Sequence, residues 1–425
     1  MTIAAMLILF LVLMVGGMPI SFSTAVACAG YVLLRPDLPN LVIAQRMFVA
    51  SDSFSLMAIP LFILAGELMN GGGLTKKIVR LASALVGHIR GGMAHITVLA
   101  SMLFASMSGS SAAAAASIGS MMIPAMKEEG YDSDFAASVT ACGAVIGPII
   151  PPSIAMVMYG SITGTSTGKL FLGGILPGIL MGFLLMTVAT LIARKRGYAI
   201  GKRTNLKTLL SAIKGSIAAI MMPVIIMGGI LSGIFTATEA GVVGAVYGLI
   251  VGLVSRETRL RDIPGIVIRA AQTSAVVMFI ISAAQLLGWI LTQAQVTTMM
   301  VNALSNVTTN PIAVFFLLLA LLLFLGCFMI DAAIISMCTP LFIPILKQYG
   351  IDPLQFGVVM CMMTTTGGVT PPVGNLLFIA CGIADVPVVK AVRTLLPFLL
   401  MLLVAIVICV FVPQLTLLLP NLLMP

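Results

Sequence analysis

The sequence predicts an all-α, polytopic membrane protein that is built as an inverted repeat, and three observations predict this class. Hydrophobic residues make up 60% and charged residues 8% of the 425 residues, whereas an ordinary globular domain carries about 25% charged residues. Apolar runs long enough to cross a bilayer, which takes about 20 residues per helix, recur along the chain. A shift of 220 residues aligns the prolines of the second half with those of the first half.

The composition also excludes other classes of protein. Strands of an outer-membrane barrel alternate apolar and polar residues, but residues 313–325 are apolar throughout. The net charge of +9 does not indicate nucleic acid, because the densest basic clusters, at 194–207 and 256–269, are predicted to be cytoplasmic loops by the positive-inside rule. We therefore expect a lipid bilayer, and no nucleic acid, around this chain. The first 34 residues contain neither Lys nor Arg, so we expect a mature helix there and no cleaved signal peptide.

The first repeat, residues 1–210, is expected to begin with scaffold helices. The elements predicted after them are an amphipathic arm on the inner surface (74–90), a re-entrant helical hairpin (92–126), a broken helix (135–167), a span (168–193) and a basic cytoplasmic linker (194–214). The arm is predicted because its basic residues recur on one helical face. The hairpin is predicted because 92–126 is too long for one span and "SMSGSS" interrupts it. Such a break is tolerated in a membrane only where protein or water covers it.

The second repeat, residues 215–425, is expected to contain a similar series. Its predicted elements are a scaffold hairpin (216–254), a span (270–292), a re-entrant hairpin (311–346), a broken helix (354–383) and a last span (395–418). The basic clusters on both sides of the scaffold hairpin predict that both of its ends are cytoplasmic. Counting crossings from there places both chain termini outside. It also makes the two re-entrant hairpins enter from opposite sides.

Proline pairs interrupt one helix in each repeat. The shift of 220 residues aligns the following prolines: Pro124 with Pro344, Pro151 with Pro371, Pro152 with Pro372 and Pro177 with Pro397. A proline inside a helix removes a hydrogen bond and clashes with the preceding turn, at a cost of about 3 kcal/mol or more. Each adjacent pair is therefore expected to unwind a crossing near the midplane, unless neighbouring helices satisfy it as a simple kink. An inverted repeat with broken helices is the architecture of secondary transporters.

The unwound segments carry groups that suit ions. The carbonyl groups freed by the two breaks are hard oxygen ligands that suit Na⁺, and they belong to Gly147, Ile150, Gly367 and Thr370. The half-helices that restart at Ser153 and Gly374 offer N–H groups and a positive dipole end, which suit a carboxylate. The Asn375 amide lies directly after the second break and can both donate and accept hydrogen bonds, so we predict that it contacts the substrate.

Several motifs occur together along nearly the whole chain. They are "IPLFILAGELMNGGG" (59–73), "SMSGSSAAAAASIGSMMIPAM" (106–126), "IGPIIPPSIAMVMYG" (146–160), "LFLGGILPG" (170–178), "GIFTATEAG" (233–241) and "GGVTPPVGN" (367–375). In this order they resemble the large membrane (M) subunit, the DctM-like family, of tripartite ATP-independent periplasmic (TRAP) transporters. One mild departure is "TATEAG", where that family is expected to have "TPTEAA", and it affects a turn.

The resemblance implies a function and partners. It implies Na⁺-coupled import of an organic acid anion across the bacterial inner membrane by an elevator mechanism, and no enzyme activity. The acids that the resemblance leaves open are C4-dicarboxylates, sialic acids and other sugar or keto acids. The implied partners are a small membrane (Q) subunit and a periplasmic substrate-binding (P) protein, and Na⁺, with two sites expected, is the coupling ion without any organic cofactor.

The resemblance also implies the site residues. The first Na⁺ site falls on Ser108, Gly147, Ile150 and Pro152, and the second on Gly326, Gly367, Thr370 and Val373, mostly through carbonyl groups. The implied substrate site falls on Ser110, Ser153 and Asp331. Asp331 could instead carry a coupling proton or cap a helix. Glu67 and Gln285 are expected to form hydrogen bonds between packed helices.

Three other functions are weighed against this one. A stand-alone Na⁺-coupled dicarboxylate or citrate symporter of similar architecture would transport without a binding protein. A membrane-embedded protease is disfavoured, because the chain has no HExxH or GxGD motif and only two His residues. A passive channel is disfavoured because rings of polar side chains are not evident in the sequence.

Overall fold

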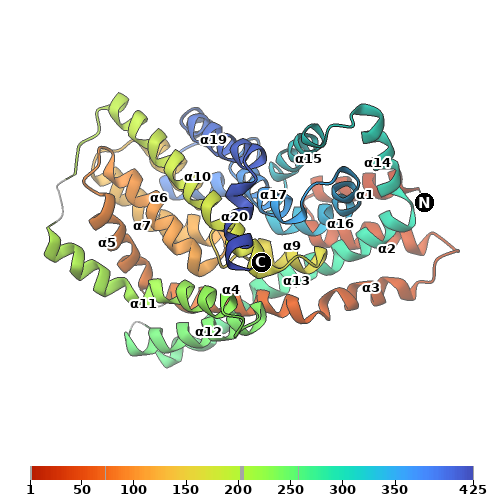
Figure 1. Cartoon of the computed structure of the whole chain (residues 1–425), viewed down its shortest axis with the longest axis horizontal. Helices are drawn as coiled ribbons and strands as arrows, with labels where there is room; N and C mark the ends of the chain where they lie inside the picture. Colours follow the sequence, from red (N-terminus) through yellow and green to blue (C-terminus); the bar gives the residue numbers. More distant parts are fainter. Residues whose placement is uncertain (1, 72, 202–204, 257, 425) are drawn as a thin grey trace.

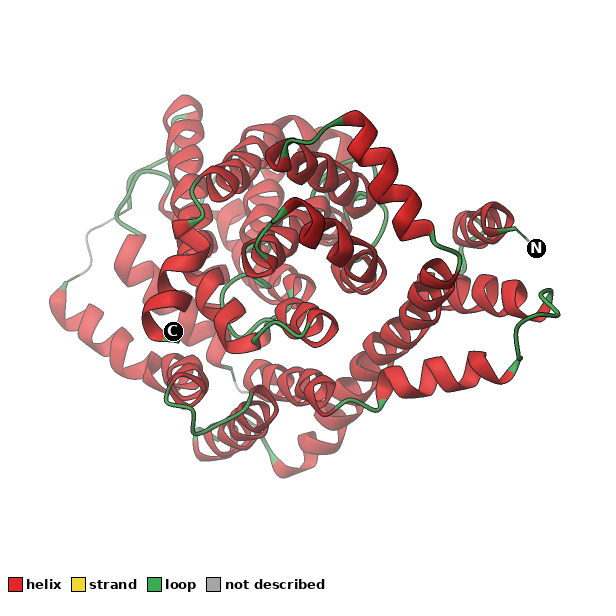
Figure 2. Ribbon diagram, turned by 45° about the vertical axis from the view of Figure 1, so that its right-hand side comes forward, coloured by secondary structure: helices red, strands yellow, loops and turns green. Residues whose placement is uncertain are grey.

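The computed structural model of the protein describes residues 2–71, 73–201, 205–256 and 258–424. These residues form helices and loops (Figure 2), with one isolated β-bridge between Arg90 and Ile200. The all-α class is therefore confirmed. Among the described residues, six helices are long and apolar enough to cross a membrane, and a bent helix pair, Leu41–Ser51 with Phe54–Asn70, adds a seventh if it is counted as one span.

The described part of the first repeat contains ten α-helices and one 3₁₀ turn. They are α1 (Ile3–Val15), α2 (Ile20–Leu33), α3 (Leu41–Ser51), η1 (Phe54–Met57), α4 (Ala58–Gly71), α5 (Leu74–Val86), α6 (Gly92–Ser108), α7 (Ser111–Glu128), α8 (Ser133–Ala144), α9 (Ile154–Thr163) and α10 (Thr167–Arg196).

The second repeat contains the remaining described elements. They are α11 (Leu206–Leu231), α12 (Ala237–Val254), η2 (Leu260–Asp262), α13 (Ile263–Gln293), α14 (Val296–Val307), α15 (Pro311–Gly326), α16 (Asp331–Tyr349), α17 (Pro353–Gly367), α18 (Asn375–Ala384), α19 (Val388–Phe411) and α20 (Gln414–Leu423). In Figure 1, α6 and α7 lie to one side of α10, α17 and α19, and α15 and α16 lie to the other side.

Two short breaks separate the paired helices at the predicted hairpins. Between α6 and α7, Gly109 has a φ of +60°, a left-handed conformation that ends α6, and the Ser110 hydroxyl caps α7 by accepting a hydrogen bond from Ala113 N (3.4 Å). Between α15 and α16, the chain turns over residues 327–330 before α16 begins at Asp331. The depth of these breaks in a bilayer stays a prediction.

The two proline pairs lie in segments that are not helical. α8 ends at Ala144 and α9 begins at Ile154, and the peptide bond between Pro151 and Pro152 is cis. In the second repeat, α17 ends at Gly367 and α18 begins at Asn375, with the same cis geometry between its two prolines. Each segment therefore exposes backbone groups that a continuous helix would use internally.

The described helices differ from the predicted boundaries at several places, and two of these differences have a local cause in the sequence. The basic linker predicted over 194–214 is helical at both ends, because α10 continues to Arg196 and α11 begins at Leu206, where leucines recur at helical spacing. The single last span predicted over 395–418 is divided into α19 and α20, because Pro413 cannot continue a helix and disfavours helical backbone in the residue before it. Residues 202–204 of the predicted linker lie outside the described residues.

Glycines hold the scaffold helices α4 and α12 together. A Cβ atom added to Gly241 would lie 2.9 Å from Leu61 Cβ, and one added to Gly248 would lie 3.3 Å from Leu68 Cβ. Real Cβ atoms essentially never approach as closely as at Gly241, and the contact at Gly248 would be tight, so glycine permits the spacing of the two helices. α4 also packs along α13, and these three helices form one wall beside the paired and broken helices.

An ionic cluster ties the end of α10 to α8 and α19. Arg196 donates from Nη2 to Asp134 Oδ2 (2.9 Å) and to Thr394 Oγ1 (2.8 Å), and from Nη1 to Asp132 Oδ2 (2.8 Å). Burial raises the pKa of the Asp134 carboxyl, but hydrogen bonds from Arg196 and Thr394 and the charge of the guanidinium outweigh it, and the net pKa is lowered. The ionised carboxylate therefore stabilises the fold.

We expect Asp134→Asn to lower the free energy of unfolding by roughly 2 kcal/mol at neutral pH, because it leaves Arg196 without its most buried partner. The folded-state pKa lies below the ordinary value of about 3.9, so this contribution is present above that pH and is lost as the pH falls through the folded pKa. The stabilities of wild type and variant should converge below about pH 4, as measured by thermal unfolding in detergent. Asp132→Asn is the control, because its side chain is 57% exposed and should contribute less. Equal losses in the two variants would contradict this assignment.

Candidate functional site

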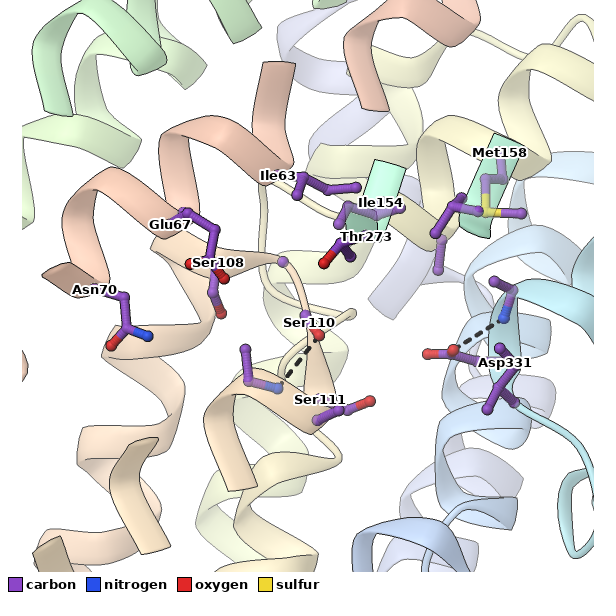
Figure 3. A pocket seen from close by; sticks show the side chains of 18 of the residues that line it. Ile63, Glu67, Asn70, Ser108, Ser110, Ser111, Ile154, Met158, Thr273 and Asp331 are labelled. Carbon is purple, nitrogen blue, oxygen red and sulfur yellow. Dashed lines mark hydrogen bonds between the residues drawn. The ribbon is translucent and has the colours of Figure 1, made fainter. Parts of the chain in front are cut away.

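A cavity of about 340 Å³ lies where the paired helices, the broken helices and the scaffold meet. Its lining comes from residues 108–113 at the α6–α7 break, residues 330–332 at the start of α16, Ile154 and Met158 of α9, and Asn375 of α18. The scaffold side is formed by α4 and α13. Figure 3 shows this arrangement around the labelled residues.

Four helices begin at this cavity. The first turns of α7, α9, α16 and α18 all contribute to its lining. The N-terminal end of a helix carries free N–H groups and a partial positive charge, so it attracts anions. A cavity bordered by four such ends suits an anionic group without any Lys or Arg, and none of the described residues that line it is a Lys or an Arg.

The structure brings the first predicted Na⁺ set close together. A Cβ atom added to Gly109 would lie 2.8 Å from Pro152 O, and one added to Gly147 would lie 3.2 Å from Ser111 N, so the α6–α7 break packs directly on the first proline-pair segment. The Ser108 hydroxyl beside it is buried and has no hydrogen-bond partner among the described residues. A buried hydroxyl without a partner is costly, so a ligand there would satisfy it.

The members of this set differ in what they can offer. The Ile150 side chain packs on α10, where a Cβ atom added to Gly178 would lie 2.6 Å from Ile150 Cγ1. Gly147 and Pro152 have no polar side-chain atoms. These three residues could therefore contribute to an ion only through their backbone, and Ser108 is the one member with a side-chain oxygen.

The second predicted Na⁺ set has a similar contact. A Cβ atom added to Gly367 would lie 2.5 Å from Gly326 Cα, so the ends of α15 and α17 meet backbone to backbone. Gly374 N also donates to Cys327 O (3.3 Å), which joins the second proline-pair segment to the α15–α16 break. The Thr370 hydroxyl donates to Thr366 O (2.9 Å), and its oxygen keeps lone pairs that could face a cation. Val373 lies in the same segment, with its side chain 42% exposed.

Both sets therefore consist of backbone carbonyl and hydroxyl oxygens. Within the part of the chain that the structure describes, no group of three or more His, Cys, Asp or Glu residues is placed to hold a metal ion. Neutral oxygen ligands do not suit zinc or other transition metals, which prefer imidazole or thiolate. The donor chemistry fits a hard monovalent cation such as Na⁺.

Three of the four predicted substrate residues line the cavity. They are Ser110, Asp331 and Asn375. The Asp331 carboxylate accepts a hydrogen bond from Ala332 N (2.9 Å), and in Figure 3 it points across the cavity toward the Ser111 hydroxyl. The Asn375 amide oxygen accepts a hydrogen bond from Leu376 N (2.9 Å), which leaves its NH₂ group able to donate.

Ser153 does not line the cavity. Its side chain is fully buried, donates a hydrogen bond to Pro148 O and accepts one from Met156 N (3.2 Å). Both hydrogen-bonding roles of the hydroxyl are thus used to hold the first proline-pair segment and to cap α9. In this structure Ser153 positions the start of α9 and does not face the cavity.

Sequence reasoning missed the scaffold side of the cavity. Glu67 and Asn70 of α4 and Thr273 of α13 line it. Glu67 Oε2 accepts a hydrogen bond from Arg269 Nε (3.2 Å), as expected for a residue between packed helices, and Asn70 Oδ1 accepts one from Ser117 of α7 (3.2 Å). The spacing of Glu67 and Asn70 places them on one face of an apolar helix, which was the available signal. Which element covers that face depends on tertiary packing.

Comparison with known proteins agrees with these features. The family model of the DctM component of tripartite ATP-independent periplasmic transporters matches residues 7–415. The chain is 36% identical over 411 residues to the sialic acid TRAP transporter large permease protein SiaM of Vibrio cholerae, with 96% of each chain covered. It is 40% identical over 406 residues to the isethionate TRAP transporter permease protein DctMQ of Oleidesulfovibrio alaskensis, with 95% of this chain and 64% of that protein covered.

A solved structure shares the fold. The chain resembles the crystal structure of the Alcanivorax borkumensis YdaH transporter with a TM-score of 0.64 and 14% sequence identity, over 89% of each chain. The relatives are transporter permeases, so this chain is a multi-pass inner-membrane transport protein and not an enzyme. The resemblance found in the sequence motifs is confirmed by these matches. The chain belongs to the DctM family, the large permease component of tripartite ATP-independent periplasmic transporters.

Proposed function

We propose that this chain imports an organic acid anion together with Na⁺, after a periplasmic binding protein delivers the anion to the outer face. The observation that carries this proposal is the single cavity at which four helix N-termini meet. Two glycine contacts also bring the α6–α7 break onto the first proline-pair segment and the end of α15 onto the end of α17. The helix ends suit the anion, and the nearby oxygens suit the cation.

Charge explains why the two ligands should depend on each other. The described residues that line the cavity include two carboxylates, Glu67 and Asp331, and no Lys or Arg. Glu67 is paired with Arg269, but Asp331 has no ion pair with a described residue, so its carboxylate would repel a bare organic anion in a site of low dielectric constant. Bound Na⁺ would offset the repulsion. We therefore expect the affinity for the anion to rise with Na⁺ concentration.

The roles that we propose for the site residues follow the two glycine contacts, one at the α6–α7 break and one between Gly326 and Gly367. We assign the first Na⁺ to Ser108, Gly147, Ile150 and Pro152, and the second to Gly326, Gly367, Thr370 and Val373. We assign the anion to Ser110, Asp331 and Asn375, with Ser153 acting through the start of α9. The buried Ser108 hydroxyl without a partner and the Gly326–Gly367 contact support these assignments.

The movement proposed is of the elevator type. The paired helices and broken helices would slide as one body along the wall formed by α4, α12 and α13. The cavity faces the ends of α4 and α13 that carry Asn70 and Arg269, and the basic cluster at 256–269 is predicted to be cytoplasmic. We infer that the present arrangement faces the cytoplasm, with both chain termini on the periplasmic side.

Two partners are proposed from the family. TRAP transporters are tripartite, and the name DctMQ joins the large component with a second one in a single protein, of which this chain covers 64%. We propose that a separate small membrane subunit packs against this chain and that a periplasmic protein binds the acid first. The relatives named for sialic acid and isethionate make these two acids the first to test.

The Ser108 hydroxyl provides a direct test of Na⁺ coupling. We expect Ser108→Ala to raise the Na⁺ concentration for half-maximal uptake about tenfold, the loss of one ligand being worth about 1.4 kcal/mol. Its fold should keep its thermal stability, since the removed hydroxyl has no partner among the described residues. Uptake is measured in proteoliposomes that contain this chain, the small subunit and the loaded binding protein, under an imposed Na⁺ gradient.

Ser101→Ala is the matched control. Ser101 also lies in α6 with a buried hydroxyl that has no partner among the described residues, but it does not line the cavity. An equal shift in both variants, or no shift in Ser108→Ala, would contradict the Na⁺ assignment. Uptake by this chain alone, without a binding protein, would favour the stand-alone symporter instead.

A further inference from the structure

A second cavity, of about 350 Å³, lies between the scaffold and the broken and paired helices. Its scaffold side is formed by Arg46 and Ser53 near the α3–η1 bend and by Gln285, Trp289 and Thr292 of α13. Its other side is formed by the end of α9 and by Pro340 of α16. We call it the outer cavity, because the proposed topology places these ends of α3 and α13 outside.

The outer cavity and the substrate cavity are both lined by α9 and α13. On α13, Val277 lines the substrate cavity and Gly288 lines the outer cavity. Eleven residues make about three helical turns, so both lie on one face of α13, about 16 Å apart along its axis. On α9, Met158 lines the first cavity and Ile162 the second, one turn apart on one face. The two cavities are stacked along the same helices.

The chemistry of the outer cavity favours an anion. Of the described residues that line it, Arg46 alone carries a charge. Its guanidinium lies over the Trp289 ring, 5.4 Å from the ring centroid, and no ion pair with a described carboxylate holds it. By contrast, Arg269 near the substrate cavity is paired with Glu67. An Arg without a carboxylate partner keeps its donors available for a carboxylate or sulfonate.

Neutral polar groups complete the lining. Gln285, Ser53 and Thr292 offer an amide and hydroxyls. The Ser161 hydroxyl at the end of α9 also lines the cavity, and it is buried without a hydrogen-bond partner among the described residues. A buried hydroxyl without a protein partner is free to form a hydrogen bond with a bound ligand or water.

We propose that the outer cavity is a binding site for a small organic anion, with the Arg46 guanidinium as its charged partner and Gln285 among its neutral donors. The site is the outward end of the path to the substrate cavity, and this part of the inference rests on the proposed transport function. If the paired and broken helices moved outward along α13, the substrate cavity would come to lie beside the part of α3 that carries Arg46. Arg46 would then hold an arriving anion before Na⁺ and the helix N-termini bind it.

The test measures charge in the cavity without needing transport. All seven native cysteines are buried, so a cysteine introduced by Thr292→Cys in the cavity is the main target for membrane-impermeant thiol reagents. The purified complex with the small subunit, in nanodiscs, is reacted with 2-sulfonatoethyl methanethiosulfonate, an anion, or with its trimethylammonium-ethyl counterpart, a cation. Adding Arg46→Gln should lower the ratio of the anionic to the cationic rate about tenfold, and Arg46→Lys should lower it far less.

Two matched controls define the effect. At Thr298→Cys, an exposed position on α14 outside the cavity, the same Arg46 variants should leave the ratio unchanged. Arg35→Gln removes another predicted outer-face Arg, which is paired with Asp37, and should leave the ratio at Thr292→Cys unchanged. Isethionate, a two-carbon sulfonate like the reagent, should slow labelling at Thr292→Cys when Arg46 is present and not in Arg46→Gln.

Three results would overturn the proposal. They are an unchanged ratio in Arg46→Gln, an absence of competition by isethionate, and a ratio that depends on anionic lipid in the nanodisc, which would assign the cavity to a lipid headgroup. Because the labelling requires no transport, a failed uptake assay would contradict the proposed function and leave the anion site standing. Normal uptake with failed labelling would contradict the anion site alone.

Discussion

Gly367→Ala should reduce Na⁺-dependent uptake about 100-fold while the chain still folds. The added Cβ atom would lie 2.5 Å from Gly326 Cα and 2.8 Å from Gly326 C, both backbone atoms that cannot rotate away. Ordinary carbon contacts lie at about 3.5 to 4.0 Å, so the ends of α15 and α17 must separate by about 1 Å. A misplacement of about 1 Å in a site can cost about 100-fold in rate.

The measurement is the initial rate of uptake in proteoliposomes against Na⁺ concentration, with folding checked by the thermal unfolding midpoint. Gly382→Ala is the matched control, because Gly382 lies in α18, the adjacent half-helix, and an added Cβ atom meets nothing within 4 Å. Gly326→Ala should repeat the loss, because its Cβ atom would lie 2.8 Å from Gly367 Cα. Full uptake by a stably folded Gly367→Ala protein would remove the second Na⁺ site from this contact.

Asp331→Asn should reduce uptake at least tenfold if the carboxylate binds the substrate or carries a proton. Asp331 is the first residue of α16, whose N-cap is Ile330. The asparagine keeps an oxygen that can accept the hydrogen bond from Ala332 N, so it preserves this contact and removes the charge. The expected tenfold loss of uptake follows because charge-assisted hydrogen bonds are worth about twice as much as neutral ones. The measurement is the uptake rate together with the substrate concentration for half-maximal uptake.

Asp352→Asn provides the control for helix capping. Asp352 caps α17 by accepting hydrogen bonds from Leu354 N (2.7 Å) and Gln355 N (3.0 Å), and asparagine caps helices about as well as aspartate. Normal uptake in both variants would leave Asp331 only a structural role in the first turn of α16. If wild-type uptake responds to a pH gradient and that of Asp331→Asn does not, the carboxylate carries a proton. A response that is unchanged by the substitution leaves substrate binding as its role.

Local chemistry made part of this architecture predictable from the sequence. The chain leaves the helical conformation at both proline pairs, because a proline lacks the N–H that a helix interior requires. The break at Gly109 and Ser110 was also visible, because glycine adopts positive φ readily and serine is a strong N-cap. These signals depend on a few neighbouring residues, so no tertiary information was needed.

Features that depend on distant residues were not predictable in the same way. Glu67 was assigned to helix packing, and its contact with Arg269 agrees with that, but its position on the substrate cavity follows from how α4 meets α6 and α9. Ser153 was implied as a substrate residue by the resemblance, but its hydroxyl donates to Pro148 O, which only the folded proline-pair segment brings near. The resemblance placed Gly326 and Gly367 in one Na⁺ set, but residue spacing alone does not predict that these two helix ends meet backbone to backbone.

The contact between α4 and α12 has a consequence for how the chain is made. α4 ends at Gly71 and α12 begins at Ala237, so a ribosome working at about 5 to 20 residues per second needs roughly 10 to 30 s to supply the partner of α4. During that interval the whole first set of paired and broken helices, α6 to α10, is already synthesised. The contact between α4 and α12 is therefore completed only after the first set of paired and broken helices has been made. A nascent chain stalled before α12 would leave the α4 surface uncovered in the membrane, where quality-control proteases could recognise it.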